Sequence, residues 1–148
     1  MRSNLFWLSD EQWKRIEPRL PANVRGVERV DDRRVISGIV HVLKSGCRWC
    51  DCPPEYGPLT TTIIASCAGA RRGVWENLFR ELARNGRSAD TQMIDSATKP
   101  TSIYKLRWRI ENTFNRLKDF RRIATRYDRL ARNYLASVCL AAALVWWI

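Results

Sequence analysis

The sequence predicts a mainly α-helical protein with a helix-turn-helix-like module in its N-terminal half. Apolar residues recur there at intervals of three and four, and Ser, Asp, Gly or Pro residues bound the runs. The length of 148 residues, 45% of them hydrophobic, suits one small domain or one domain with a docked fragment. Small helical bundles with no DNA partner have the same periodicity, so the spacing leaves that alternative open.

The first two helices are marked by their ends. Ser9 and Gln12 fit a capping box, which predicts a helix over residues 10–19 that stops before Pro21. Asp32 begins a second helix, and Gly46 is a natural residue to end it. Residues 59–72 are ambiguous. Residues 74–84 are predicted to be helical, because their apolar side chains share one face: Trp75, Leu78, Phe79 and Leu82.

The pattern changes at "TQMIDSAT". Met93 and Ile94 are typical of the end of a short strand, with Asp95 at its exit, where a carboxylate is either a metal ligand or an ordinary turn residue. After Pro100 we expect helix to the end of the chain, interrupted near Asn133.

The charge of the chain favours an acidic partner. Lys and Arg number 26 against 15 Asp and Glu, a formal net charge of +11, so nucleic acid is the first candidate and a membrane surface the second. The opening residues hold no uninterrupted apolar stretch, and the apolar run 134–148 is shorter than the roughly 20 residues that span a bilayer. We therefore expect a cytoplasmic protein whose last helix is buried or faces an oligomer partner.

Three of the five cysteines fall in "CRWCDC", at Cys47, Cys50 and Cys52. A zinc site needs further ligands at finger-like distances, and only two isolated cysteines and the single histidine, His41, remain. Free thiols in a reducing compartment and an ordinary packed histidine are the preferred interpretations.

The stretch "YKLRWRIENTFNRLK" places one carboxylate, Glu111, among cations on a segment expected to be helical. Four of its residues lie three, four and seven positions apart, which returns to nearly the same helical face: Tyr104, Arg107, Glu111 and Lys118. Such a stripe aims a carboxylate at a divalent metal and holds phosphates beside it, as phosphoryl transfer requires. A solvated helix with an Arg107–Glu111 ion pair has the same spacing, so the spacing does not decide between the two.

The pattern Tyr-x2-Arg-x3-Glu-x6-Lys resembles the C-terminal signature of DDE transposases of bacterial insertion sequences in the IS4 and IS5 group. Other stretches resemble the IS402-like N-terminal region, the first catalytic strand and the tail of that family: "LSDEQWKRIEPRLP", "GCRWCDCPPEYGP", "GVWENLFRELA", "MIDSAT" and "RRIATRYDRLARNYLASVCLAAAL". The resemblance covers nearly the whole chain.

The resemblance implies an RNase H-like catalytic domain and assigns its residues. Asp95 corresponds to the first catalytic aspartate and Glu111 to the closing glutamate, both as ligands for Mg²⁺ or Mn²⁺, with Tyr104, Arg107 and Lys118 supporting the site. No residue corresponds to the second aspartate, and Asp95 and Glu111 are only sixteen positions apart, so an internal deletion of most of the sheet is the natural explanation. We expect strand cleavage to be lost and metal not to be tightly bound, because two side chains leave most of a two-metal site to water.

The resemblance also implies three parts and a partner. Residues 1–87 form an IS402-like helical DNA-binding region, residues 88–103 a remnant of the first catalytic strand and a junction, and residues 104–148 the C-terminal transposase helices. The expected partner is DNA at the terminal inverted repeats of a transposon, on the bacterial nucleoid. The expected phosphate contacts, whose alternative is a solvated helix face, are Arg71, Arg72, Arg116, Arg121, Arg122, Arg126, Arg129 and Arg132.

A second departure from the family lies in "LTTTIIASCAGA", where an aromatic and arginine-rich stretch is usual. For suitable choices of the free codon bases, a neighbouring reading frame of "ASCAG" can encode Arg-Phe-Val-Arg-Trp. We therefore hypothesise that compensating frameshifts replaced residues 62–69, which removes cations and aromatic anchors from a candidate DNA-contacting helix.

Three functions are open at this point. The leading one is a truncated, catalytically inactive transposase, followed by a non-catalytic regulator that occupies transposon ends or forms mixed oligomers with intact transposase, and by a decayed reading frame without selected function. The regulator is favoured by apolar residues that we expect to be exposed without their sheet neighbours: Leu140, Leu144, Trp146, Trp147 and Ile148.

Overall fold

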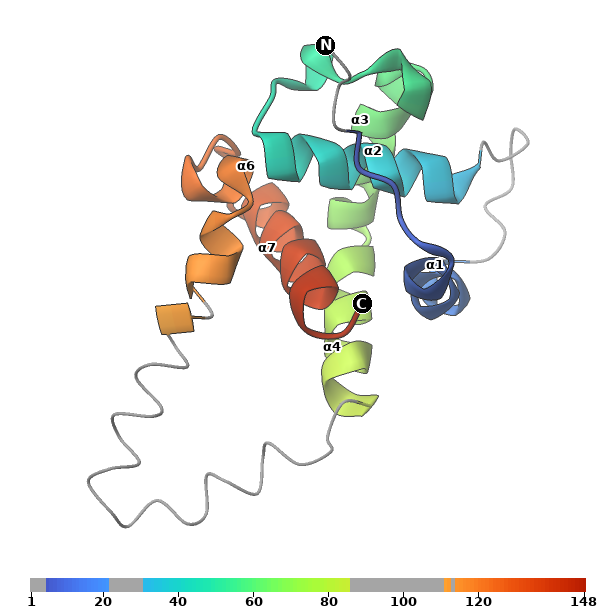
Figure 1. Cartoon of the computed structure of the whole chain (residues 1–148), viewed down its shortest axis with the longest axis vertical. Coiled ribbons are helices and arrows are strands. Elements are labelled where there is room, and N and C mark those ends of the chain that lie inside the picture. The colour runs from blue at the N-terminus through green and yellow to red at the C-terminus, as the bar shows by residue number, and fades with distance from the viewer. Residues whose placement is uncertain (1–4, 22–30, 86–110, 113) are drawn as a thin grey trace.

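The protein is described by a computed structural model over residues 5–21, 31–85, 111–112 and 114–148. Within those ranges every regular element is helical, which confirms the mainly α class there (Figure 1). The α-helices are α1 (Asp10–Ile16), α2 (Asp32–Ser45), α3 (Leu59–Arg71), α4 (Val74–Asn85), α6 (Arg121–Ala124) and α7 (Ala131–Trp146). Short 3-10 turns cover Glu17–Arg19, Trp49–Asp51 and Pro54–Tyr56. The predicted strand end at Met93 and Ile94 lies outside the described residues.

α1 begins at the predicted capping box. Ser9 Oγ accepts the N–H of Gln12 at 3.2 Å, and Gln12 Oε1 accepts the N–H of Ser9 at 3.0 Å. This reciprocal pair satisfies amide donors that the first turn of a helix leaves unpaired. Ile16 is fully buried and anchors the helix in the core. Together α1 and the 3-10 turn that follows it confirm the helix predicted over residues 10–19.

α2 is the central helix of the core. Its first turn is capped by Asp31, whose carboxylate accepts the N–H groups of Arg33 and Arg34, and it ends at Gly46, with φ of 71°. All of residues 35–40 are buried, because α3, α6 and α7 each pack against α2. The bounds of this helix match those predicted from Asp32 and Gly46.

The ambiguous segment 59–72 is helical. α3 and α4 are joined through Gly73, whose φ of 67° is a left-handed conformation that favours glycine. Small residues let the two helices approach closely, since a Cβ added at Gly69 would lie 2.5 Å from Nε1 of Trp75. Trp75 is buried together with Leu78 and Leu82, as the helical spacing of α4 predicts.

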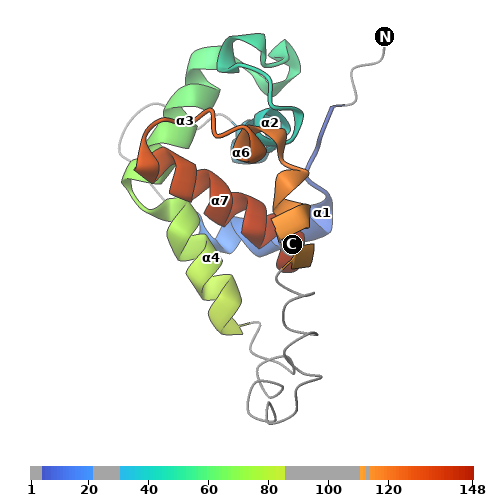
Figure 2. The ribbon, with the colours of Figure 1, turned by 90° about the vertical axis from the view of Figure 1, so that its left-hand side faces the viewer.

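α7 lies against α4, as both views show (Figures 1 and 2). The Trp147 ring packs edge-on against Phe79 of α4, with 5.3 Å between ring centroids and an interplanar angle of 81°. The expectation that the C-terminal apolar residues are exposed is wrong for Leu140, which is 1% exposed. The other four are half-buried, because α4 covers much of this helix: Leu144, Trp146, Trp147 and Ile148.

The predicted interruption of the C-terminal helix is displaced toward the N-terminus. Asn133 lies inside the first turn of α7, whereas the chain leaves helical geometry after α6, where Arg126 adopts a left-handed conformation with φ of 51°. A left-handed residue breaks the sequence of i to i−4 hydrogen bonds, so the helix stops there and restarts at Ala131.

Candidate nucleic-acid interface

The predicted catalytic residues are only partly within the described ranges. Asp95, Tyr104 and Arg107 lie outside them. Glu111 and Lys118 lie in helical residues 111–112 and 114–118, and both are exposed. Across the described part of the chain, no group of three or more His, Cys, Asp or Glu side chains is placed to hold a metal ion. The stripe and its metal ligands therefore stay a prediction.

The strongest concentration of cations is the basic segment, which we define as residues 114–132. It contains seven Lys or Arg residues and two Asp residues. It forms the helical residues before α6, α6 itself and the loop to α7, on one side of the molecule (Figure 1). Six of its cations are exposed: Arg116, Lys118, Arg121, Arg126, Arg129 and Arg132. Two further predicted phosphate contacts, Arg71 and Arg72, are exposed at the end of α3.

Arg122 differs from the other predicted phosphate contacts because it is buried. Its side chain is 8% exposed and forms an ion pair with Asp128, 13% exposed, with 3.0 Å between Nη2 and Oδ1. Nη1 also donates to the carbonyl of Cys47 at 3.2 Å, and the guanidinium lies 5.0 Å from the centroid of the Trp49 ring. These contacts use the donors and one face of the guanidinium, so Arg122 holds the basic segment onto the loop after α2 and offers no exposed cation to a phosphate.

Arg126 combines backbone strain with an aromatic contact. A left-handed conformation is uncommon for a residue other than Gly, Asn or Asp, and it costs about 1–2 kcal/mol for a residue with a Cβ. The Arg126 guanidinium lies 5.6 Å from the centroid of the Tyr134 ring. The left-handed residue ends α6 in the manner of a helix cap, since the Tyr127 N–H donates to the Arg122 carbonyl at 3.4 Å and the Arg126 N–H to the Ile123 carbonyl at 3.1 Å.

The aromatic residues of the basic segment divide between packing and exposure. Phe120 is 3% exposed and belongs to the core. Phe114 and Tyr127 are 59% and 57% exposed, although the Tyr127 ring also lies 5.8 Å from the Arg122 guanidinium. Exposed rings among cations are suited to stacking on nucleic-acid bases.

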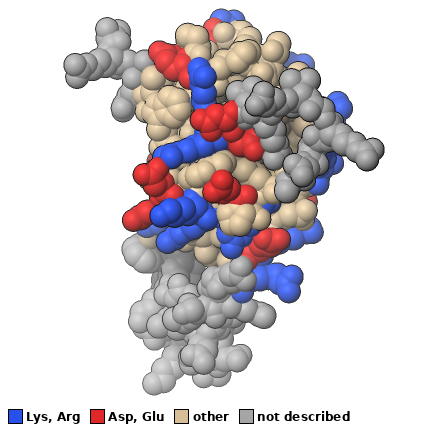
Figure 3. Space-filling model, turned by 90° about the vertical axis from the view of Figure 1, so that its right-hand side faces the viewer, with Lys and Arg blue, Asp and Glu red and all other residues tan. Residues whose placement is uncertain are grey.

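The opposite side of the molecule carries mixed charge. Figure 3 views the side where α1 and the start of α2 lie, and there Lys and Arg side chains alternate with Asp and Glu. Arg33 pairs with Asp10 at 2.6 Å and Arg19 with Glu81 at 3.4 Å. Alternating charges cancel at a distance, so this side attracts a phosphate backbone less than the basic segment does.

The cysteines form no disulfide among the described residues, and Cys47 lies beside the basic segment, where its carbonyl accepts from Arg122. All five are free, and burial raises the pKa of Cys52 to about 11, so this thiol stays protonated at neutral pH.

His41 packs its ring against Tyr56 at 5.3 Å between centroids, and burial lowers the pKa of the imidazole. In the described ranges, no helix is both long and apolar enough to cross a bilayer.

Sequence reasoning missed the pairing of Arg122 with Asp128. A buried arginine in a cationic run has the same sequence neighbourhood as an exposed one. The available signal was the acidic residue six positions later, next to Tyr127, in a stretch where acids are otherwise rare.

Comparison with known proteins gives matches over both halves of the chain. A family model for transposases of the IS4/5 family (DUF4096) matches residues 8–79, and one for the transposase DDE domain matches residues 68–146. A curated relative, the insertion element IS402 uncharacterized 16.2 kDa protein of Burkholderia cepacia, is 35% identical over 94 residues, covering 56% of this chain and 62% of the relative. The chain thus spans less than two thirds of that relative. No solved structure gives a significant match.

Proposed function

Because the chain belongs to the family of transposases with a DDE domain, we propose that it is a truncated transposase that binds DNA without cutting it. The partner is double-stranded DNA at the terminal inverted repeats of the parent insertion sequence. The chain then acts on transposition by occupying those ends, as a non-catalytic regulator.

The observation that carries DNA binding is the exposure of six cations in the basic segment. Each phosphate that such a cation neutralises releases a counterion, which supplies most of the affinity of non-specific DNA binding. Buried Arg122 supports this arrangement, because its contacts with the Cys47 carbonyl and the Trp49 ring hold the segment to the body of the protein while the neighbouring cations face outward. A cation set held on a folded surface loses less conformational freedom on binding than a disordered tail.

The proposed loss of catalysis rests on the sequence. Asp95 and Glu111 are sixteen positions apart, and no residue corresponds to the second aspartate of the family. A two-metal site aligns its ions with several carboxylate oxygens, which two side chains do not supply. Mg²⁺ or Mn²⁺ would bind weakly at most, through Asp95 and Glu111, where it would otherwise activate the attacking water and stabilise the leaving oxygen.

The test is fluorescence anisotropy of the purified chain on a duplex with the terminal inverted repeat and on a scrambled duplex, over a range of salt. We expect the triple variant Arg126→Gln, Arg129→Gln, Arg132→Gln to lower the slope of log affinity against log salt by roughly two to three. A matched control removes three exposed cations away from the segment: Lys14→Gln, Arg80→Gln and Arg84→Gln. The control should change the slope by less than about one.

Equal effects of the two triple variants would contradict an interface at the basic segment, since net charge alone would then explain binding. A preference of about tenfold for the inverted repeat, about 1.4 kcal/mol, is expected of a chain that still occupies transposon ends. Metal-dependent strand cleavage that disappears in Glu111→Gln would overturn the proposed loss of catalysis.

A further inference from the structure

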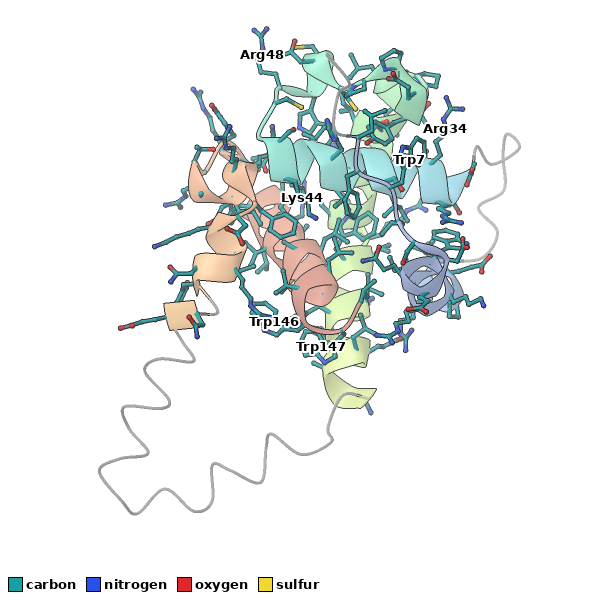
Figure 4. The ribbon with its side chains drawn as sticks, in the orientation of Figure 1. Trp7, Arg34, Lys44, Arg48, Trp146 and Trp147 are labelled. Carbon is teal, nitrogen blue, oxygen red and sulfur yellow. The ribbon has the colours of Figure 1, made fainter. Side chains whose placement is uncertain are left out.

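A cavity of about 370 Å³ adjoins the basic segment. It lies between the N-terminal segment before α1, the end of α2, residues 116–120 and the end of α7. Figure 4 shows Lys44 extending from α2 on the side where α7 lies. The residues that determine its chemistry are Phe6, Lys44, Arg116, Asp119, Phe120 and Leu144.

The N-terminal wall of the cavity is held in place by hydrogen bonds to α2 and to the loop after it. Tyr56, which is fully buried, donates its hydroxyl to the carbonyl of Phe6 at 2.7 Å. Two residues further on, the Leu8 N–H donates to Ser37 Oγ at 3.2 Å, and Arg33 donates to the Leu8 carbonyl at 2.6 Å. These bonds hold the backbone of residues 6–8 against the body of the protein, and the Phe6 ring lies beside Lys44.

Lys44 faces aromatic rings rather than a direct acidic partner. Its Nζ lies 4.2 Å from the centroid of Phe6 and 5.8 Å from that of Phe120. Burial lowers the pKa of Lys44, and the charge of Asp119 partly opposes that effect. Within the described residues, neither Lys44 nor Arg116 forms an ion pair. Lys44 as a whole is exposed, so an incoming anion can reach its ammonium and form a charge-assisted hydrogen bond that no described acid supplies.

The lining of the cavity favours a ligand that has both an anionic part and an apolar part. Lys44 and Arg116 outnumber Asp119, so the cavity favours an anion, while Phe6, Leu144 and their neighbours offer apolar contact. The volume lies within the range of small-molecule sites, which combine apolar walls with a few placed polar groups. An inorganic anion would use only the cations, and a neutral ring only the walls. A nucleoside monophosphate uses both.

We propose that this cavity binds a nucleoside monophosphate unit, with its phosphate at Lys44 and Arg116 and its base against Phe6 and Leu144. Two sources supply that chemistry: a free nucleotide, and an unpaired nucleotide of a DNA strand lying along the basic segment. The second source rests on the proposed DNA binding, and Arg116 belongs to both surfaces.

The first experiment is isothermal titration calorimetry of the full chain with deoxyadenosine monophosphate. Lys44→Gln and Arg116→Gln are each expected to weaken binding about tenfold, the loss of one charge-assisted hydrogen bond. The matched control, Arg129→Gln, removes an exposed cation of the basic segment that does not line the cavity, and it should leave the affinity within about twofold. Inorganic phosphate and deoxyadenosine should each bind more weakly than the nucleotide.

The second experiment separates the two sources by anisotropy on labelled DNA. A blunt duplex measures the basic segment alone, and duplexes with a short unpaired or abasic overhang test whether a base of the strand reaches the cavity. We expect the base-containing overhang to bind more tightly than the abasic one, and Lys44→Gln to abolish that difference without changing affinity for the blunt duplex.

Several outcomes would overturn the proposal. Absence of nucleotide binding, or equal losses in Lys44→Gln and Arg129→Gln, would show that the cavity selects nothing beyond charge. Val145→Phe narrows the cavity without changing charge and should also weaken the nucleotide, which covers the case in which Lys44→Gln does not fold. A chain that binds the nucleotide but not the blunt duplex would refute the proposed DNA binding and retain the cavity site.

Discussion

The guanidinium of the single residue Arg122 connects the loop after α2 with the loop before α7. Its contacts are a carboxylate, a backbone carbonyl and two aromatic rings. Sequence reasoning correctly located the cationic run, but it treated Arg122 and Arg121 alike. Only the packing of Trp49 and Asp128 around Arg122 distinguishes the buried cation from the exposed one.

Removing the carboxylate of Asp128 should destabilise the fold strongly. Asp128→Ala leaves the Arg122 guanidinium buried without its counter-charge, which we expect to cost about 3 kcal/mol of the free energy of unfolding, measured in urea. Asp119→Ala, an exposed acid of the same segment, should stay within about 0.5 kcal/mol. Similar losses in the two variants would indicate that the buried pair contributes nothing beyond general charge balance.

His41 should make stability depend on pH. Burial lowers the pKa of the folded imidazole below its ordinary 6.5, with Glu55 opposing the shift, so the unfolded chain binds the proton more readily. The contribution of neutral His41 is therefore complete above pH 6.5 and is lost as the pH falls through the folded pKa. We expect the melting temperature to fall more between pH 7.5 and 5 in the native chain than in His41→Gln. Parallel curves for the two proteins would contradict this.

Among the helices, α3 forms without a clear apolar stripe. Its sequence is a run of β-branched residues, 60–64, followed by a run of small residues, 65–70, so periodicity left it ambiguous. The helices α1, α2 and α4 have caps or strong apolar faces and were predicted within a few residues. A cavity of about 210 Å³ lies where α3 meets α2, lined on the α3 side by Ala65, Ala68 and Gly69. The hypothesis that frameshifts replaced residues 62–69 stays a prediction, which the reading frames of the gene would test.

Filling that cavity should stabilise the protein. Ala68→Leu adds apolar volume beside Val35 and Ile39 of α2, and we expect a gain of about 1 kcal/mol in the free energy of unfolding. Thr60→Leu, on the exposed part of α3, serves as the control and should change little. Gly69→Ala should destabilise, because its Cβ would meet the Trp75 ring. A loss of stability in Ala68→Leu would show that the walls of this cavity do not accept a larger side chain.

The start of α7 was predicted less well than the other helix ends. A left-handed turn normally carries Gly, Asn or Asp, and the residue that adopts it is Arg126, so the sequence held no ordinary signal for the break. The apolar pattern of residues 134–148 correctly indicated a helix but not its neighbour. That α4 covers it follows from a pairing between distant segments, which periodicity does not reveal.

Charge is distributed unevenly over the whole molecule. The net charge of +11 predicted an acidic partner, but composition did not indicate which surface would carry it. In the described residues, the side of α1 neutralises its cations with nearby acids, whereas the basic segment keeps six exposed. Of the predicted catalytic stripe, Glu111 and Lys118 are both exposed, while Asp95, Tyr104 and Arg107 lie outside the described ranges, so the stripe stays a prediction.

The packing of α7 against α4 has a consequence for the covalent connection between the two halves of the chain. α4 ends at Asn85 and the basic segment begins at residue 114, yet both halves contribute to one core that includes Leu78 and Leu140. The shared apolar core therefore holds the two halves together without help from the covalent connection between them. We expect such a body to tolerate excision or insertion between its halves, and two fragments cut there to reassociate by complementation.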